Sequence, residues 1–305
     1  MAKTIRLEAP IVIIIYNRFY YSTVLYEKLL ELKPSRLYIV ADGPKNDSDK
    51  LLCLKTRKIF DAISWDCNIT RIYAETNLGC GPRVYSGLNE VFQSEDRAIV
   101  LEDDCIPANS FIAFCNEVLE KFKNDNRFMH ISGSNFTPER SNDEFSCIYS
   151  KYGHIWGWAT WKRAWDLFDY NMPEWPLIKE KKVLEYFFNS RKEFNFFSRH
   201  FNTYYNDPSK PWGYRWMYCR LINNGLSVIP KENLITNIGA DGTYNSAGIN
   251  NKALYKNVSS DFCIKKYPPY VMCNNWFDNY HFTKHIYYSK NYNLKNVFIR
   301  LLKHI

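Results

Sequence analysis

Three consecutive carboxylates, Glu102-Asp103-Asp104, follow an apolar run at residues 98–101. Carboxylates side by side at a strand end repel one another, so this acidic run is unfavourable unless a cation lies nearby. Mg²⁺ and Mn²⁺ prefer oxygen ligands, and such an ion would neutralise charge on a departing nucleotide diphosphate. The alternative is a solvated acidic turn before the helix expected from Asn109. Three acids alone are a weak motif, but their place after a buried strand favours a divalent metal site.

Two shorter polar groups, Asn17-Arg18 and Asp42-Gly43, close the first two predicted strands. An Asp can accept hydrogen bonds from a nucleoside base, and an Arg can pair with phosphate or stack on a base. For Asp42 the simpler alternative is a turn residue before Gly43 and Pro44.

A glycine-containing loop, Asn77-Leu-Gly79-Cys-Gly-Pro-Arg83, opens the third predicted helix. Its backbone N–H groups could face a phosphate, because helix N-termini attract anions. The loop lacks G-x-G-x-x-G spacing, so a dinucleotide site is not predicted.

Apolar runs typical of strands alternate with helical patterns through the first 131 residues. Continuous β-branched runs indicate parallel strands buried on both faces. Right-handed crossovers place helices on both faces, and ligands bind beyond the carboxyl ends of the strands, so the four polar groups should share one site. The predicted strands are 10–16, 36–41, 68–74, 97–101 and 128–131, and the predicted helices are 22–32, 48–63, 82–93 and 109–123.

The second half of the chain carries most of the tryptophans, and aromatic residues make up 17% of the whole chain. Part of this aromatic content must be core, and exposed rings would suit the C–H faces of sugars. Residues 177–200 and 212–223 are predicted to be helical, 226–230 to be a strand and 232–262 to be a long loop. The two halves are expected to form one continuous fold.

Composition narrows the class of partner and the compartment. The net charge of +8 favours anionic partners such as nucleotide diphosphates, but the basic residues are scattered, so nucleic acid is not predicted. The nine cysteines form no C-x-x-C pair, which argues against structural zinc and indicates buried thiols in a reducing compartment. No apolar run is long enough to span a membrane, so a cytoplasmic protein is expected.

The last residues, 293–305, place apolar side chains at helical spacing with Lys295, Arg300 and Lys303 off that face. One interpretation is a helix docked on the protein. The other is a basic amphipathic helix that attaches the protein peripherally to an anionic membrane surface on the inner face of the cytoplasmic membrane.

The order of these motifs resembles that of the GT-A glycosyltransferases. More narrowly, it resembles a bacterial family of nucleotide-diphospho-sugar transferases, often labelled hemolytic-protein-like and distantly similar to N-acetylglucosaminyltransferase I. The series covers most of residues 10–240 in order and is far more specific than any single stretch. The matching stretches are PIVIIIYNR, ADGP, NLGCGPRVYSGLNEVF, AIVLEDDCIPANSFIAFC, MHISGSNF, YSKYGHIWGWATWKRAWDLFD and GLSVIPKENLITNIG.

The resemblance implies an α/β fold of GT-A type, Rossmann-like, with a mostly parallel sheet flanked by helices and an aromatic-rich acceptor-side half. We expect residues 1–245 to form this glycosyltransferase domain, with 1–131 as its nucleotide-sugar-binding half and 132–245 as its acceptor-side half. Residues 246–305 would form a C-terminal extension that ends in the basic amphipathic helix.

The resemblance also implies roles for individual residues. Asp104 would be the direct ligand of Mn²⁺ or Mg²⁺, and the donor would be a nucleotide-diphosphate sugar, with a UDP-sugar as the first choice. Residues expected near the donor are Asn17, Arg18, Asp42, Gly43, Asn77, Gly79, Arg83, Glu102 and Asp103. Residues expected along the sugar and acceptor cleft are Ser134, Asn135, His154, Trp156, Gly157, Trp158, Trp212, Tyr214 and Arg215. Core packing is the alternative for the tryptophans.

The chain departs from the family pattern at three positions. Ser134 stands where family members often carry an acidic residue. Gly213 stands where an Asp would be the natural base of an inverting enzyme, and Tyr244 stands where a His can complete the metal site. Asp241, with Asp207 behind it, is therefore the predicted catalytic base.

The motifs and the resemblance predict a metal-dependent hexosyl- or N-acetylhexosaminyltransferase, and the resemblance implies that it inverts the anomeric centre. Its acceptor would be a glycan or lipid-linked glycan in the synthesis of a bacterial surface polysaccharide such as lipopolysaccharide or capsule. The alternative is a sugar-nucleotide or glycan-binding protein of the same fold that has lost catalysis. A nucleotidyltransferase is disfavoured, because only Asn17-Arg18 follows the first strand, without a glycine-rich signature.

Overall fold

The computed structural model describes residues 9–138, 144–239 and 258–287. Its first part is a parallel sheet in the order β3 (Asn68–Tyr73), β2 (Arg36–Ala41), β1 (Ile11–Ile15) and β4 (Arg97–Glu102). Ile13 pairs with Ile39 on one side and with Leu101 on the other. The central strands β1 and β4 are buried on both faces, as their apolar sequences predict, whereas the edge strand β3 is largely exposed.

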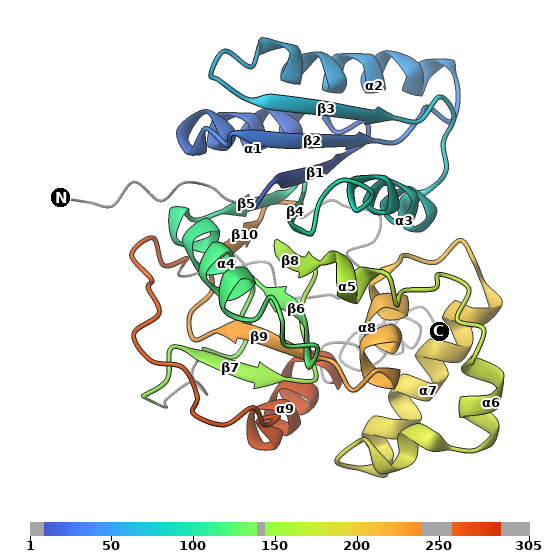
Figure 1. The fold of residues 1–305 in the computed structure, drawn as a ribbon. Coiled ribbons are helices and arrows are strands. Elements are labelled where there is room, and N and C mark those ends of the chain that lie inside the picture. Colours follow the sequence, from blue (N-terminus) through green and yellow to red (C-terminus); the bar gives the residue numbers. More distant parts are fainter. Residues whose placement is uncertain (1–8, 139–143, 240–257, 288–305) are drawn as a thin grey trace, which may run out of the picture.

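The same sheet continues into the second half of the chain through β8 (Trp158–Trp161), β6 (Phe128–Ser132), β9 (Leu226–Pro230) and β7 (Cys147–Ser150). Figure 1 shows this continuation from the blue strands into the green and orange ones. β8 and β7 run antiparallel to their neighbours, and the other strands share one direction. The two halves therefore share one continuous, mostly parallel sheet.

Helices cover both faces of this sheet (Figure 1). α1 (Phe19–Leu32) and α4 (Asn109–Lys121) pack with Ile11, Ile13 and Ile15 on one face. α3 (Cys80–Val91) and α8 (Gly213–Ile222) pack with Val12 and Val40 on the other. α2 (Asp47–Ile59), followed by the short helix η1 (Phe60–Ala62), and α5 (Lys162–Trp165) complete the two layers.

The helix predicted over residues 177–200 is wrong as a single element. The structure has α6 (Trp175–Glu180), the short 3-10 helix η3 (Val183–Tyr186) and α7 (Arg191–Asn206). Lys182 adopts a left-handed conformation with φ of 50° and ends the first helix. Ser190 starts the next one, because its side chain accepts a hydrogen bond from Glu193 N–H.

Part of the predicted 232–262 loop is a strand. β10 (Ile235–Asn237) pairs antiparallel with β5 (Cys105–Pro107), which directly follows the acidic run. Toward the end of the described chain lie α9 (Asn275–His281) and a π-helical turn, η5 (Phe282–Tyr287). The predicted amphipathic helix at 293–305 lies outside the described residues.

The α/β class, the mostly parallel sheet flanked by helices and the aromatic-rich second half are thus confirmed. The predicted strands all occur, whereas the antiparallel strands β7 and β8 were not predicted. Within the described residues, no helix has both the length and the apolar character needed to cross a bilayer.

Candidate functional site

The acidic run lies where β4 ends and the chain turns into β5. Arg18, from the turn between β1 and α1, pairs with two of its members. Its Nη2 and Nε contact the Asp103 carboxylate, and its Nη1 lies 2.8 Å from Asp104 Oδ2. One guanidinium thus pairs with two of the three carboxylates, so the cluster retains excess negative charge when all three are ionised.

The environment of the acidic run raises the pKa of two of its members. Burial, followed by the charges of Asp104 and Asp103, raises the pKa of Glu102 to about 8, although Arg18 opposes the shift. Burial also raises the pKa of Asp103 to about 7, again against the effect of Arg18. A bound cation would favour the ionised forms, because metal ligands must be deprotonated. The donor set therefore fits a divalent ion.

Asp104 is enclosed by the segment that follows β10. Asn237 Nδ2 donates to Asp104 Oδ1 at 3.3 Å, and the Ile238 N–H donates to the Asp104 backbone oxygen at 2.9 Å. A Cβ at Gly239 would lie 2.1 Å from Asp104 Oδ2, so only glycine fits there. Asn237 and Gly239 were missed at the sequence level, because the β5–β10 pairing that brings them here joins distant parts of the chain.

Among the described residues, the one group of three side chains whose possible ligand atoms lie close together consists of histidines. The three carboxylates of the acidic run therefore do not offer three ligand oxygens to a single metal position. A site of this kind suits Mg²⁺ or Mn²⁺ when substrate phosphates and water supply the remaining ligands. Both carboxylate oxygens of Asp104 have neighbours: Oδ1 accepts a hydrogen bond from Asn237 Nδ2, and Oδ2 pairs with Arg18 Nη1.

Asp42 organises the loop at the end of β2 and the start of α3. Its nearly buried carboxylate accepts hydrogen bonds from the Gly43, Leu78 and Gly79 N–H groups and from Asn77 Nδ2, at 2.9 to 3.0 Å. Gly79 has φ of 85°, which favours glycine, and it caps α3. The carboxylate therefore fixes the loop that was predicted to lie by the donor.

Asn17 and Arg83, which were also predicted to lie near the donor, make hydrogen bonds to other parts of the fold. Asn17 Nδ2 donates to Asp49 Oδ1 at 2.5 Å and so points toward α2, unlike its neighbour Arg18. Arg83 is buried, its Nη2 donates to the Ile72 backbone oxygen at 2.5 Å, and burial lowers its pKa. Both residues support the strand ends from behind.

Cys80, the first residue of α3, links the loop to the acidic run. Burial raises its thiol pKa to about 12, and the charge of Glu102 is the next contribution, with Asp42 and Asp103 adding to it. Arg18 thus meets the acidic run, and Asp42 meets Asn77 and Gly79, whereas Asn17 and Arg83 bond to other parts of the fold.

Three of the residues predicted to line the acceptor cleft lie in the core. Trp158 and Trp212 are at most 1% exposed and their rings lie 5.0 Å apart. Arg215 is equally buried and donates to the backbone oxygens of Tyr170 at 2.7 Å and Asp207 at 2.9 Å. These positions favour the core-packing interpretation for the three.

Other acceptor-side residues shape the backbone near β10. Ser134 is buried and donates to the Trp156 backbone oxygen at 3.0 Å. Asn135 is also buried and donates to the Pro230 oxygen at 2.9 Å. Gly157 has φ of 60°, and a Cβ there would lie 2.2 Å from Ile235 Cδ1. Three other predicted acceptor-side residues are half-buried: His154, Trp156 and Tyr214. The Trp156 ring packs against Phe136, and the Tyr214 ring stacks on His200.

Of the two predicted bases, Asp207 is described and Asp241 is not. The Ser209 side chain and N–H donate to Asp207 Oδ1 at 2.6 and 3.0 Å, and these bonds lower the Asp207 pKa. Its loop approaches the start of α3, because a Cβ at Gly81 would lie 2.9 Å from the Lys210 backbone oxygen. Asp241 and Tyr244 lie outside the described residues.

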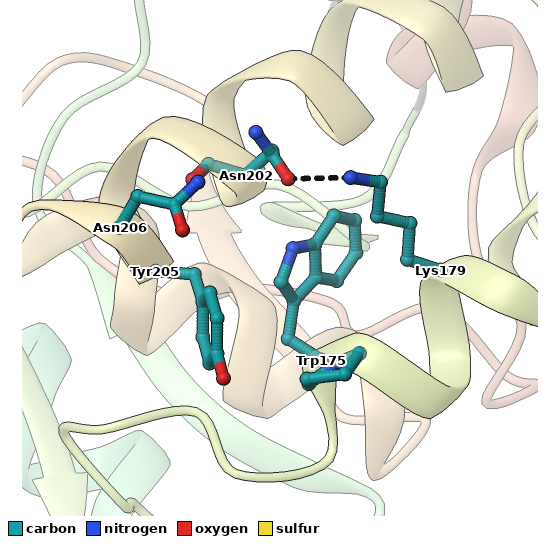
Figure 2. A pocket seen from close by; sticks show the side chains of 6 residues that line it. Trp175, Lys179, Asn202, Tyr205 and Asn206 are labelled. Carbon is teal, nitrogen blue, oxygen red and sulfur yellow. Dashed lines mark hydrogen bonds between the residues drawn. The ribbon is translucent and has the colours of Figure 1, made fainter.

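A hollow of about 400 Å³ lies between α6 and α7, apart from the strand ends. Trp175, Pro176, Lys179, Asn202, Tyr205 and Asn206 line it, and Lys179 Nζ donates to Asn202 Oδ1 at 2.7 Å (Figure 2). It contains none of the predicted site residues.

No family model and no curated protein matches the chain. Among solved structures, an active-site mutant of LgtC matches with a TM-score of 0.40 and 12% identity over 72% of each chain. Galactosyltransferase LgtC with donor and acceptor sugar analogs matches with a TM-score of 0.34 and 12% identity over 80% of this chain and 91% of that one. HddC from Yersinia pseudotuberculosis matches with a TM-score of 0.29 and 9% identity over 50% and 77%. Similarity this low assigns no function.

Proposed function

We propose that the protein is a metal-dependent glycosyltransferase of GT-A type that moves a sugar from a nucleotide-diphosphate donor to a glycan acceptor. The observation that carries this proposal is the acidic run at the end of β4. One guanidinium pairs with two of its three carboxylates, burial raises the pKa of two of the three, and Gly239 leaves room for the Asp104 carboxylate.

In this proposal Asp104 holds Mn²⁺ or Mg²⁺, with Glu102 and Asp103 beside it. The ion would supply positive charge to the leaving diphosphate. Arg18 keeps Asp103 and Asp104 in place, and Asp42 holds the loop at 77–79 so that the α3 N-terminus faces the same edge. A helix N-terminus adds partial positive charge for a phosphate.

The acceptor chemistry rests on a carboxylate base that deprotonates the attacking hydroxyl, with inversion at the anomeric carbon. Asp241 is our first choice and Asp207 the second, although the hydrogen bonds that lower the Asp207 pKa make it a weak base. We further propose a UDP-sugar donor, a surface glycan or lipid-linked acceptor, the division at residue 245 and peripheral membrane attachment through 293–305.

A second candidate function is binding of a sugar nucleotide or glycan without turnover. The observation that favours it is Gly213 at the first position of α8, where the chain offers no carboxylate. This function shares the donor site and differs only in the missing base.

The test is donor binding and sugar transfer across a panel of UDP-, GDP-, CMP- and dTDP-sugars, with Mn²⁺ or with EDTA. We expect one nucleotide class to raise the thermal midpoint with Mn²⁺. Asp104→Asn should lower turnover at least ~10²-fold, because it removes charge stabilisation of the leaving group.

Asp166→Asn is the matched control, because Asp166 is an exposed carboxylate that pairs with Lys162 on the same helical turn. This variant should keep wild-type turnover. Full activity of Asp104→Asn, or no binding of any sugar nucleotide, would overturn the proposal. Binding with no turnover would support the second candidate.

A further inference from the structure

Three histidines from two distant segments meet in the second half of the molecule. His154 lies in the turn between β7 and β8, His281 ends α9, and His285 lies one helical turn later in η5. One ring nitrogen of each lies within 4.8 Å of those of the other two. The Nε2 atoms of His154 and His281 are 2.9 Å apart.

The backbone at His154 is held rigidly. Its N–H donates to Ser132 Oγ at 3.1 Å, and its backbone oxygen lies 3.0 Å from His130 Nε2. The His281 ring also has a hydrogen-bond partner, because Thr137 Oγ1 lies 3.3 Å from His281 Nδ1. A hydrogen bond to the second ring nitrogen orients a ligating imidazole and fixes its tautomer.

Aromatic rings form the surroundings of the cluster. Phe136 meets His154 edge-on at 4.2 Å and stacks on His285 at 4.4 Å, and Phe277 stacks on His281 at 5.6 Å. Burial lowers the pKa of all three histidines, to about 4 for His285. The imidazoles are therefore neutral at physiological pH, which is the form that binds metals.

The geometry is close to that of a ligand set. With metal–nitrogen bonds of about 2.1 Å, two ligands lie about 3.0 Å apart at a right angle and about 3.4 Å apart in a tetrahedron. The 2.9 Å separation of the His154 and His281 Nε2 atoms needs little change to reach either value. All three ligand atoms lie within 4.8 Å of one another, so a separation at that upper limit would have to close by about 1.4 Å to reach the tetrahedral spacing.

We propose that His154, His281 and His285 bind one borderline transition-metal ion of the Zn²⁺, Co²⁺ or Ni²⁺ class. Neutral imidazoles suit these ions, whereas Mg²⁺ and Mn²⁺ prefer the oxygen ligands of the acidic run. Three protein ligands leave at least one coordination position for water or an external ligand. The ion joins α9 and η5 to the turn before β8, which continues through Trp156 and Gly157 toward β10.

The experiment uses the untagged full-length protein, freed of metal with a chelator. It is titrated with Co²⁺ and then with Zn²⁺ as a competitor. We expect one equivalent of Co²⁺ with visible d–d absorption, bleached by Zn²⁺, and a higher thermal midpoint with Zn²⁺. Asp104→Asn should keep this spectrum, because the acidic run is a different site.

His285→Ala should weaken Co²⁺ binding by more than ~10-fold, since losing a ligand has a larger effect than losing a side chain that hydrogen-bonds to a ligand. His200→Ala is the matched control, because its ring stacks on Tyr214 outside the cluster, and it should bind as the wild type does. If His285→Ala does not fold, Thr137→Val tests the same site, with binding about 10-fold weaker. Absence of Co²⁺ and Zn²⁺ binding by the wild-type protein, or unchanged binding by the folded variants, would overturn the proposal and leave a metal-free hydrogen-bonded histidine cluster.

Discussion

The proposed donor half, built on β1 to β4, and the aromatic half, from residue 150 onward, bury polar groups in different ways. At the donor strand ends, charged side chains face one another: Arg18 pairs with Asp103 and Asp104. In the aromatic half, Arg215 donates to backbone oxygens and lies over the Tyr170 ring at 4.3 Å. The first arrangement retains excess negative charge when all three carboxylates are ionised, whereas the second satisfies backbone carbonyl groups of the fold.

This difference teaches that residue type alone is a poor guide to a site. A tryptophan or an arginine in the aromatic half can stabilise the core as readily as it can bind a sugar. Acidic residues at the end of a buried strand have no comparable packing role, because neighbouring carboxylates repel each other. Only position relative to the strand ends separates the two cases.

A core tryptophan that contacts a ligand would contradict the distinction between the two halves most strongly. Trp158→Ala should lower the free energy of unfolding by ~3–5 kcal/mol, because the side chain is fully buried among other rings. Trp156→Ala should cost less, since its side chain is half-buried. Urea denaturation followed by circular dichroism measures both.

The functional part of this test uses Trp158→Phe, which keeps a ring in the core. Its acceptor KM should equal that of the wild type, whereas Trp156→Ala should raise the acceptor KM. A larger change of KM in Trp158→Phe than in Trp156→Ala would mean that the aromatic half binds substrate through its core.

The sequence predicted the donor half well for physical reasons. Strands of the run type Ile-Val-Ile-Ile-Ile carry a strong local pattern, and parallel topology sets where their ends meet. Asp42, Asn77 and Gly79 follow from that topology alone, although the dense hydrogen bonding of Asp42 does not. In the aromatic half, β8 is a short Trp-Ala-Thr-Trp segment. Its periodicity does not show whether its tryptophans belong to a buried strand or line a cleft.

Contacts between distant segments were beyond local patterns. Asn237 and Gly239 reach Asp104 only through the pairing of β10 with β5. The histidine cluster had one local signal, the i, i+4 spacing of His281 and His285, which places two rings on one helical face. Its third member, His154, comes from a turn 127 residues earlier.

The charge excess in the donor half predicts a pH dependence of the metal-free protein. The pKa of Glu102, about 8, and that of Asp103, about 7, exceed the ordinary values because of burial. A carboxyl with a raised folded pKa stabilises the fold fully below its unfolded pKa, and this contribution is lost as pH rises through the folded pKa. In EDTA, the free energy of unfolding should therefore fall between about pH 4 and pH 8.

Mn²⁺ should show the converse, because it competes with a bound proton. Its affinity should weaken about tenfold per pH unit from about pH 8 to about pH 7, where Glu102 binds a proton, and more steeply below about pH 7, where Asp103 does so too. Calorimetric titration at about pH 6, 7 and 8 measures this. Glu102→Gln mimics the protonated side chain and should flatten both profiles. Profiles that stay as steep in this variant would show that Glu102 does not titrate with the ion.

The smallest effect is expected at Gly213, the position at which the family pattern has the Asp that would be the catalytic base. Gly213→Asp places a carboxylate at the first position of α8, which favours the helix by ~0.3–1 kcal/mol. Its Cβ would lie 3.0 Å from Ile155 Cδ1, the flexible end of that side chain, so stability should change little. If Asp241 already serves as the base, turnover should change by less than tenfold, since general-base catalysis contributes ~10²–10⁴-fold only once. Gly213→Asn is the control of equal size without charge, and a gain of ~10² or more in Gly213→Asp alone would show that the present chain binds its ligands without a base.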